Sequence, residues 1–201
     1  LVMSATPIPR TMIMTVFGDM DTSIIRNKPK ARKEIKTYSK LENKIDDVIK
    51  FTKKQINLQN QVFWVCPLIE ESKKIDHQSS VKRYESLKKI FNNKVGLLHG
   101  SLDKEEKNNI LEKFLNKKID ILVSTTVIEV GIDFPNANTI IIENANKFGL
   151  SQLHQLRGRV GRGSTKSFCY LVTSNKNGME NKRLCVLQKS NDGFYIAEKD
   201  L

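Results

Sequence analysis

The sequence contains few cysteines and histidines, which limits the disulfide and metal chemistry that it supports. The 201-residue chain has three residues of each type, with no Cys-x-x-Cys pair and no metal-ligand spacing among them. They are Cys66, Cys169, Cys185, His77, His99 and His154. A disulfide framework or zinc site is therefore not indicated, no metal site is expected, and a reducing compartment is the default expectation.

Long apolar runs are also missing. Runs such as Asp120–Val123 and Thr139–Ile142 have the length of a strand and are far too short to cross a bilayer. The N-terminus shows no charged, then apolar, then small-residue pattern of a secretory signal. These absences predict a soluble protein without a membrane partner.

Positive charge is in excess. Lys and Arg number 34 against 22 Asp and Glu, which gives a formal net charge of +12 and an isoelectric point near 9.6. Such a surface favours contact with a polyanion. The excess is mostly lysine, in a chain also rich in asparagine and isoleucine, so an AT-rich genome explains it equally well. Charge is therefore supporting evidence only.

Short apolar runs alternate with amphipathic stretches along the chain. The predicted strands are Val62–Cys66, Val95–Leu98, Ile119–Val123, Thr139–Glu143 and Phe168–Val172. The predicted helices are Glu42–Ile56, Ser80–Phe91 and Lys104–Phe114, followed by Met179–Leu187 and a short helical stretch after Asp192-Gly193. This alternation predicts an α/β fold in which helices cover a parallel sheet. The helical lysines most often form a solvated face, and none is assigned a nucleic-acid role individually.

The densest polar pattern is Gln152–Gly163, which holds three arginines and three glycines in twelve residues. A guanidinium keeps its charge at all relevant pH values, and glycine lets the backbone turn or approach a ligand closely. Arg159 and Arg162 are therefore candidates to bind a phosphate whose charge changes during a reaction. A solvated basic loop is the alternative interpretation.

Four segments in order resemble motifs of superfamily 2 helicases. Ser4–Arg10 resembles motif III, Val62–Ser72 motif IV, Val123–Pro135 motif V, and Gln152–Gly163 motif VI. The resemblance implies a RecA-like parallel sheet flanked by helices, the second lobe of a two-lobe motor.

Further segments narrow the resemblance to the RecG family of bacterial branched-DNA helicases. They are Asp19–Ile25, Cys66–Ser72, Thr126–Asp133 and Asn191–Leu201. Transcription-repair coupling translocases share motifs III, V and VI almost as closely and are the nearest rival. A non-catalytic, basic RecA-like module that binds nucleic acid is the alternative from another class.

For the nucleotide site, the resemblance implies that Arg159 and Arg162 reach the γ-phosphate of ATP. Gln155 would contact the same phosphate or couple it to motif III, and the alternative for it is an exposed helix residue. Gly131 and Asp133 would lie near the nucleotide, with Asp133 accepting a hydrogen bond from a ribose hydroxyl. A turn that ends a helix explains Asp133 equally.

For the nucleic acid, the resemblance favours Thr125 or Thr126 as a phosphate contact, with a helix cap as the alternative. His99 and Gly100 follow a predicted strand, where ligands bind in α/β proteins, and a simple turn is the alternative. The small residues Ser4-Ala5-Thr6 are expected to couple hydrolysis to movement, although a turn before two prolines also explains them.

The predicted organisation has three parts. Residues 1–36 would be the tail of a first lobe and a linker, 37–174 the RecA-like lobe, and 175–201 the start of a truncated helical hairpin. The sequence holds no Gly-x-x-x-x-Gly-Lys-Ser/Thr loop and no Asp-Glu-x-His segment.

The resemblance consequently implies a piece of a longer bacterial cytoplasmic protein, whose first lobe supplies the Mg²⁺ ligands and whose wedge domain reads branched DNA. The piece alone should not hydrolyse ATP. The intact chain is expected to be an ATP-dependent DNA helicase acting on stalled forks and Holliday junctions.

Overall fold

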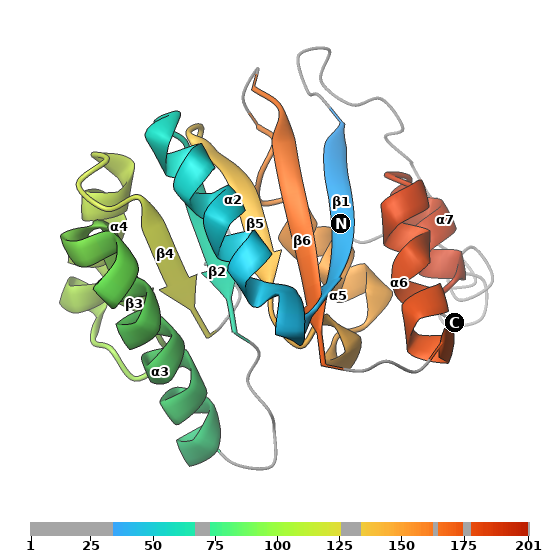
Figure 1. Cartoon of the computed structure of the whole chain (residues 1–201), viewed down its shortest axis with the longest axis horizontal. Helices are drawn as coiled ribbons and strands as arrows, with labels where there is room; N and C mark the ends of the chain where they lie inside the picture. The colour runs from blue at the N-terminus through green and yellow to red at the C-terminus, as the bar shows by residue number, and fades with distance from the viewer. Residues whose placement is uncertain (1–33, 67–72, 126–133, 163–164, 175–177, 201) are drawn as a thin grey trace, which may run out of the picture.

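The computed structural model describes residues 34–66, 73–125, 134–162, 165–174 and 178–200, of which 73–79 and 178–181 are described by their backbone alone. Six parallel strands form one sheet in the order β1-β6-β5-β2-β4-β3 (Figure 1). The strands are β1 Ile35–Leu41, β2 Gln61–Val65, β3 Val95–Leu98, β4 Ile121–Ser124, β5 Ala137–Ile142 and β6 Ser167–Thr173. The predicted parallel α/β fold is confirmed.

All five predicted strands are present, with ends that differ from the prediction by no more than two residues. The sixth strand, β1, was not predicted. It forms one edge of the sheet and pairs only with β6 among the described strands. Its side chains alternate, with Ile35 and Thr37 buried and Lys36 and Tyr38 exposed. A strand with this alternation contains no apolar run, which is the signal by which the other five strands were predicted.

Helices follow most strands, as the alternation predicted. They are α2 Ile45–Asn57, α3 Lys73–Phe91, α4 Lys104–Leu115, α5 Leu150–Arg157, α6 Gly178–Lys189 and α7 Gly193–Glu198. A 3₁₀ turn, η1 Glu42–Lys44, begins the predicted Glu42–Ile56 helix. Helix α3 begins seven residues before the predicted start at Ser80, because its first two turns are mostly polar and show no apolar period.

Two apolar clusters cover the two faces of the sheet. Helices α2 and α3 lie on one face, where Val48, Leu87 and Phe91 belong to the same apolar cluster as Trp64. Helices α4 to α7 contribute to the cluster on the other face, which includes Phe114 among its members. Because both faces are covered, β2 is buried along its whole length.

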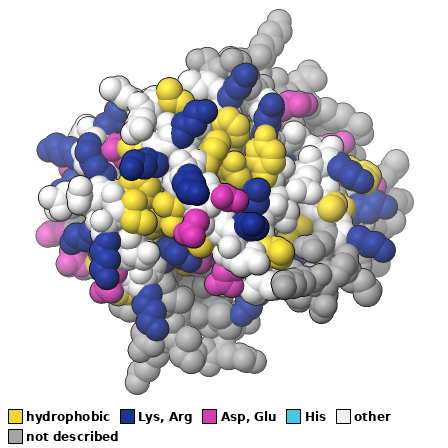
Figure 2. All heavy atoms as spheres, viewed as in Figure 1, with side chains coloured by type: hydrophobic (Ala, Val, Ile, Leu, Met, Phe, Trp, Pro, Cys, Tyr) yellow, Lys and Arg dark blue, Asp and Glu magenta, His cyan; other side chains and the backbone are white. Residues whose placement is uncertain are grey.

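The face that carries α2 and α3 shows lysine and arginine side chains spread over the surface and interspersed with acidic ones (Figure 2). Such mixed charge is typical of a solvated helix face. Within the described part of the chain, no helix is long and apolar enough to cross a membrane.

The C-terminal helices pack against the sheet and α5. Leu184 and Leu187 of α6 and Ile196 of α7 belong to the same apolar cluster as Leu153 of α5. Helix α6 also packs against β1, and α7 packs against α5. The division of the chain at positions 36 and 174 stays a prediction.

Candidate functional site

The arginine-rich segment Gln152–Gly163 forms α5 and the turn that follows it. Leu150, Leu153 and Leu156 are buried, so one side of α5 faces the core. Gln155 is exposed on the other side. The main-chain N–H of Arg159 donates to the carbonyl oxygen of Leu156 at 3.0 Å, which continues the helical turn past the last residue of α5. Gln155 precedes Arg159 by four positions, a spacing that in a helix places two side chains on the same side.

A buried glycine anchors the turn that presents the two candidate arginines. Gly161 has a φ of +77°, a value that L-amino acids with side chains rarely adopt. A Cβ atom at this position would lie 3.0 Å from Cγ1 of Ile35 and 3.5 Å from Cβ of Ser167. Ile35 begins β1 and Ser167 begins β6, so the turn lies at the amino edge of the sheet, where strands start.

Arg159 and Arg162 project from this anchored turn. Arg159 is partly buried and Arg162 is exposed, while Val160 between them is buried. Burial lowers the pKa of the Arg159 guanidinium, and the nearby positive charge of Arg162 lowers it further. Both guanidinium groups remain charged at neutral pH, so the pair creates a positive potential that suits a multiply charged anion.

The third arginine of the segment has a different environment. Arg157 is 2% exposed, and its Nη1 donates hydrogen bonds to Oγ1 of Thr37 at 3.2 Å and to the carbonyl oxygen of Leu187 at 2.6 Å. Its Nη2 donates to the carbonyl oxygen of Ser190 at 3.1 Å and lies 2.8 Å from Nδ1 of His154, which must accept because a guanidinium only donates. Arg157 therefore fastens the end of α5 to the end of α6.

A second contact fastens the beginning of α5. The carboxylate of Asp200 accepts hydrogen bonds from the main-chain N–H groups of Leu150 at 2.7 Å and Ser151 at 2.9 Å. Burial alone would raise the pKa of Asp200, but these hydrogen bonds and the charge of Arg183 bring it below its usual value. The residue caps α5 from fifty positions away, a relation that no local sequence pattern reveals.

Polar groups expected to contact nucleic acid lie at the opposite, carboxyl edge of the sheet. His99 and Gly100 directly follow β3, and Thr125 directly follows β4. The two strands are neighbours, and the main-chain N–H of Thr125 donates to the carbonyl oxygen of Leu98 at 3.3 Å. Gly100 is exposed, with open space where a Cβ would lie, whereas Thr125 is only 5% exposed. The structure thus brings these three residues together.

One cation at this edge was not predicted. The ammonium group of Lys107 in α4 donates to the carbonyl oxygen of Gly100 at 3.3 Å. A basic residue one turn inside a helix carries no signal in the sequence, because many lysines occupy such positions. The predicted residues Ser4, Ala5, Thr6, Thr126, Gly131 and Asp133 lie outside the described residues.

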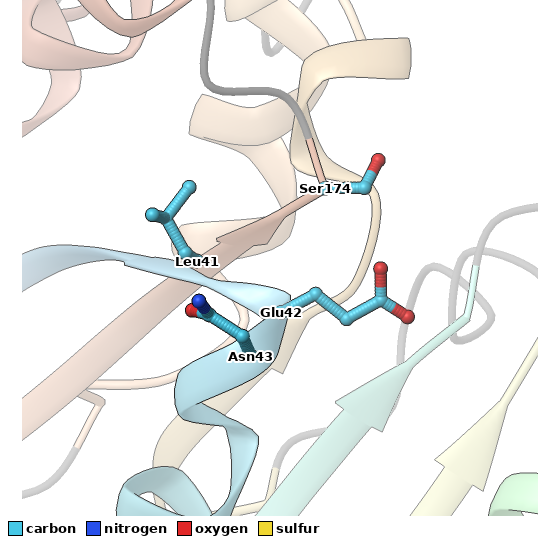
Figure 3. Close-up of a pocket in the computed structure, with 4 residues that line it drawn as sticks. All are labelled: Leu41, Glu42, Asn43 and Ser174. Carbon is cyan, nitrogen blue, oxygen red and sulfur yellow. The ribbon is translucent and has the colours of Figure 1, made fainter.

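A surface hollow of about 410 Å³ lies at the carboxyl ends of β1 and β6. Leu41, Glu42, Asn43 and Ser174 line it (Figure 3). Its lining includes a carboxylate and no basic side chain, which disfavours a phosphate ligand. Among the described residues, no group of three His, Cys, Asp or Glu side chains is placed to hold a metal ion.

Comparisons with known proteins agree with this arrangement. The chain is 47% identical over its whole length to the ATP-dependent DNA helicase RecG of Bacillus subtilis (strain 168) and 50% identical to that of Pasteurella multocida (strain Pm70). It spans only 30% and 29% of those relatives.

Solved structures show the same fold. A structure of RecG bound to a three-way DNA junction superposes with a TM-score of 0.83 at 45% identity, over 98% of this chain and 26% of that one. Yeast Dbp5 bound to RNA and ADP BeF3 has a TM-score of 0.62 at 20% identity, covering 94% of this chain and 46% of that one, and shares the fold. The model of the helicase conserved C-terminal domain matches residues 43–164. The chain belongs to the family of helicase conserved C-terminal domains.

Proposed function

We propose that this chain is the second motor lobe of an ATP-dependent DNA helicase that remodels branched DNA. One observation carries the proposal: a lobe similar over its whole length to RecG presents the neighbouring cations Arg159 and Arg162 on an anchored turn. A lobe that only bound nucleic acid would have no need for two cations at the edge opposite its nucleic-acid contacts.

At the amino edge, Arg159 and Arg162 would bind the γ-phosphate of ATP when the first lobe closes on this one. During transfer, negative charge is redistributed over the phosphate oxygens, and fixed guanidinium groups stabilise that charge. Gln155 is exposed on the same side of α5 and would contact the same phosphate. Gly131 and Asp133 would hold the ribose side of the nucleotide.

The remaining nucleotide chemistry belongs to a first lobe. This sequence has no phosphate-binding loop with a Walker lysine, so Mg²⁺ and the triphosphate would be held mainly by the other lobe of the parent chain. The second lobe alone is therefore expected to show no ATP hydrolysis above background.

At the carboxyl edge, His99, Gly100, Thr125 and Thr126 would contact the DNA backbone. Contacts to phosphates carry little sequence information, so the motor would be indifferent to base sequence. Preference for branched DNA would come from a wedge domain elsewhere in the parent chain, an expectation that rests on the family resemblance. A RecG of similar fold was solved on a three-way DNA junction, which supports a branched DNA partner. We place this activity in the bacterial cytoplasm.

Ser4, Ala5 and Thr6 would couple the two edges. Replacing Ser4 and Thr6 together by alanine should reduce unwinding more than it slows hydrolysis, because small hydroxyl groups exchange hydrogen-bond partners as the lobes move. A parallel fall in the rates of unwinding and hydrolysis would contradict the coupling role of these residues.

The test measures ATP hydrolysis by the full-length protein with forked DNA, linear duplex, single-stranded DNA and RNA. Arg159→Ala should lower the stimulated rate by about 10³-fold, the effect typical of an arginine finger. Lys166→Ala is a matched control, since Lys166 is an exposed cation directly before β6, at the same edge of the sheet.

Strong stimulation by forked DNA that Arg159→Ala abolishes and Lys166→Ala preserves would support the helicase. Stimulation by linear duplex alone would indicate a translocase of the transcription-repair coupling kind. No stimulation by any nucleic acid would leave a binding module.

A further inference from the structure

Three side chains form a connected polar cluster near the carboxyl edge of the sheet. Trp64 comes from β2, Arg83 from α3, and Glu143 directly follows β5. Oε1 of Glu143 accepts hydrogen bonds from Nε1 of Trp64 and from Nε of Arg83, each at 2.5 Å. Its Oε2 accepts from Nη2 of Arg83 at 3.2 Å, and the guanidinium carbon lies 5.6 Å from the centroid of the indole ring.

The cluster is largely shielded from water. Trp64 is fully buried, and the side chains of Arg83 and Glu143 are 18% and 15% exposed. Burial alone would lower the pKa of Arg83, but the hydrogen bonds and charge of Glu143 raise it. Desolvation offsets much of the attraction in such a pair, so a net gain in stability does not explain it, whereas removing one partner leaves a shielded charge unpaired.

The geometry defined here is the position of α3 on the sheet. Helix α3 packs against β3 and β4, with Leu87 and Phe91 in the apolar cluster on that face. These two strands end directly before His99 and Thr125. A shift of α3 would therefore displace the ends of the strands that carry the proposed nucleic-acid contacts.

The main chain of Glu143 also joins β5 to β2. Its main-chain N–H donates to the carbonyl oxygen of Val65 at 2.9 Å, and the N–H of the next residue, Cys66, donates to the carbonyl oxygen of Ser124 at 2.8 Å. The end of β2 is thereby held between β5 and β4. Its contact on β4 is Ser124, the residue before Thr125.

We propose that Glu143 is a positioning residue for nucleic-acid contact at the carboxyl edge, acting through Arg83 and Trp64. This inference rests on the proposed function, because it requires that DNA binds at this edge. Glu143 itself would repel a phosphate, and Arg83 is committed to Glu143 by two hydrogen bonds. Neither side chain needs to touch DNA.

The test replaces Glu143 by glutamine in the full-length protein and measures binding of forked DNA and the kinetics of ATP hydrolysis. Glutamine keeps an oxygen acceptor for Trp64 and removes the charge that holds Arg83. DNA affinity should fall about tenfold, which corresponds to about 1.4 kcal/mol of binding free energy. The KM for ATP and the hydrolysis rate without DNA should stay within about twofold, since the nucleotide edge is not affected.

Salt dependence separates positioning from direct contact. Because no phosphate contact is removed, the slope of log Kd against log salt should be unchanged in Glu143→Gln and Arg83→Gln.

A series of variants tests the contact between Arg83 and Glu143. Arg83→Lys should lose less affinity than Arg83→Gln, since lysine keeps the positive charge but cannot form the bidentate contact. The double variant Glu143→Gln/Arg83→Gln should bind no worse than either single variant. Glu85→Gln, an exposed acid on the same helix, is the matched control and should bind as the unsubstituted protein does.

Several outcomes would overturn the inference. Tighter DNA binding by Glu143→Gln, or a slope reduced by about one in Arg83→Gln, would make Arg83 a phosphate contact. Equal losses of ATP and DNA affinity with a lowered melting temperature would make the cluster merely structural, and unchanged DNA affinity in an active enzyme would exclude the role. An unsubstituted protein without DNA-dependent hydrolysis would instead overturn the proposed function.

Discussion

Replacing Arg157 by methionine tests whether the arginines of the segment Gln152–Gly163 have different tasks. Arg157 is buried and binds the ends of α5 and α6 to Thr37 of β1, whereas Arg162 is exposed on the turn. We expect the substitution at Arg157 to destabilise the fold and the same substitution at Arg162 to affect only hydrolysis.

The magnitude follows from the hydrogen bonds that are lost. Methionine fills much of the same space but donates no hydrogen bond, so the carbonyl oxygens of Leu187 and Ser190 lose a charged donor. Hydrogen bonds to charged groups contribute about 1.5–3 kcal/mol each, so the two together are worth roughly 4 kcal/mol. That is a large share of the roughly 5–15 kcal/mol by which a domain is stable.

Urea unfolding monitored by tryptophan fluorescence measures this loss. Trp64 is the only tryptophan of the chain and is fully buried in β2, so its emission should report on loss of the core. With a slope of about 2 kcal/mol/M, a loss of roughly 4 kcal/mol lowers the midpoint by about 2 M. Arg162→Met should change the free energy of unfolding by less than about 0.5 kcal/mol.

A loss of less than about 1 kcal/mol for Arg157→Met would refute the reasoning, because it is the size expected for a solvated arginine. An equal loss in both variants would show that the three arginines do not divide into structural and functional groups.

Two further substitutions test the contacts around α5. Asp200→Asn should cost about 0.5–1 kcal/mol at pH 7, because one amide oxygen replaces the two carboxylate oxygens that accept from Leu150 and Ser151 and the negative charge beside the helix N-terminus is lost. The folded-state pKa of Asp200 is lowered, so this contribution is present above the unfolded pKa near 4 and is lost as the pH falls through the folded pKa. Unfolding curves of the two proteins should converge in acid, and a difference that persists at low pH would contradict the cap. Gly161→Ala should cost about 2 kcal/mol in thermal unfolding, since φ is +77° and a Cβ would meet a side-chain carbon of β1 at 3.0 Å. Gly100→Ala, where the space is open, should cost much less, and equal losses would rule out strain as the cause.

The interior strands could be predicted because their sequences carry the signal of burial on both faces. In β5, for example, Ala137–Ile142 is buried at every position. Strand β1 could not, because one of its faces carries Lys36 and Tyr38, which are exposed, and its pairing partner β6 lies more than 120 residues later. An alternating polar strand at a sheet edge is recognised only once its neighbour is known.

The candidate site shows the same limit. Arg159 and Arg162 were singled out by type and spacing, and the structure places them together on one turn. The sequence could not tell that Arg157 points inward, because its acceptors lie thirty residues away in another helix. The capping of α5 by Asp200 is equally non-local. Residue type predicts which chemistry is possible. Long-range packing decides which of several arginines is exposed and available for it.

Helix α5 links the two edges of the lobe. It follows β5 from the carboxyl edge and ends at the turn that carries Arg159 at the amino edge. Eight residues of helix span about 12 Å. Asp200 holds one end and Arg157 the other, so in the proposed function α6 and α7 would follow a displacement of α5 on nucleotide binding at Arg159. Closure at the nucleotide edge would then move α6 and α7 together with α5. Because α6 packs against β1, the contact between α6 and the sheet would change. An uncapped α5 would absorb that displacement locally, so under the proposed function the two long-range contacts at its ends would transmit movement as well as stabilise the fold.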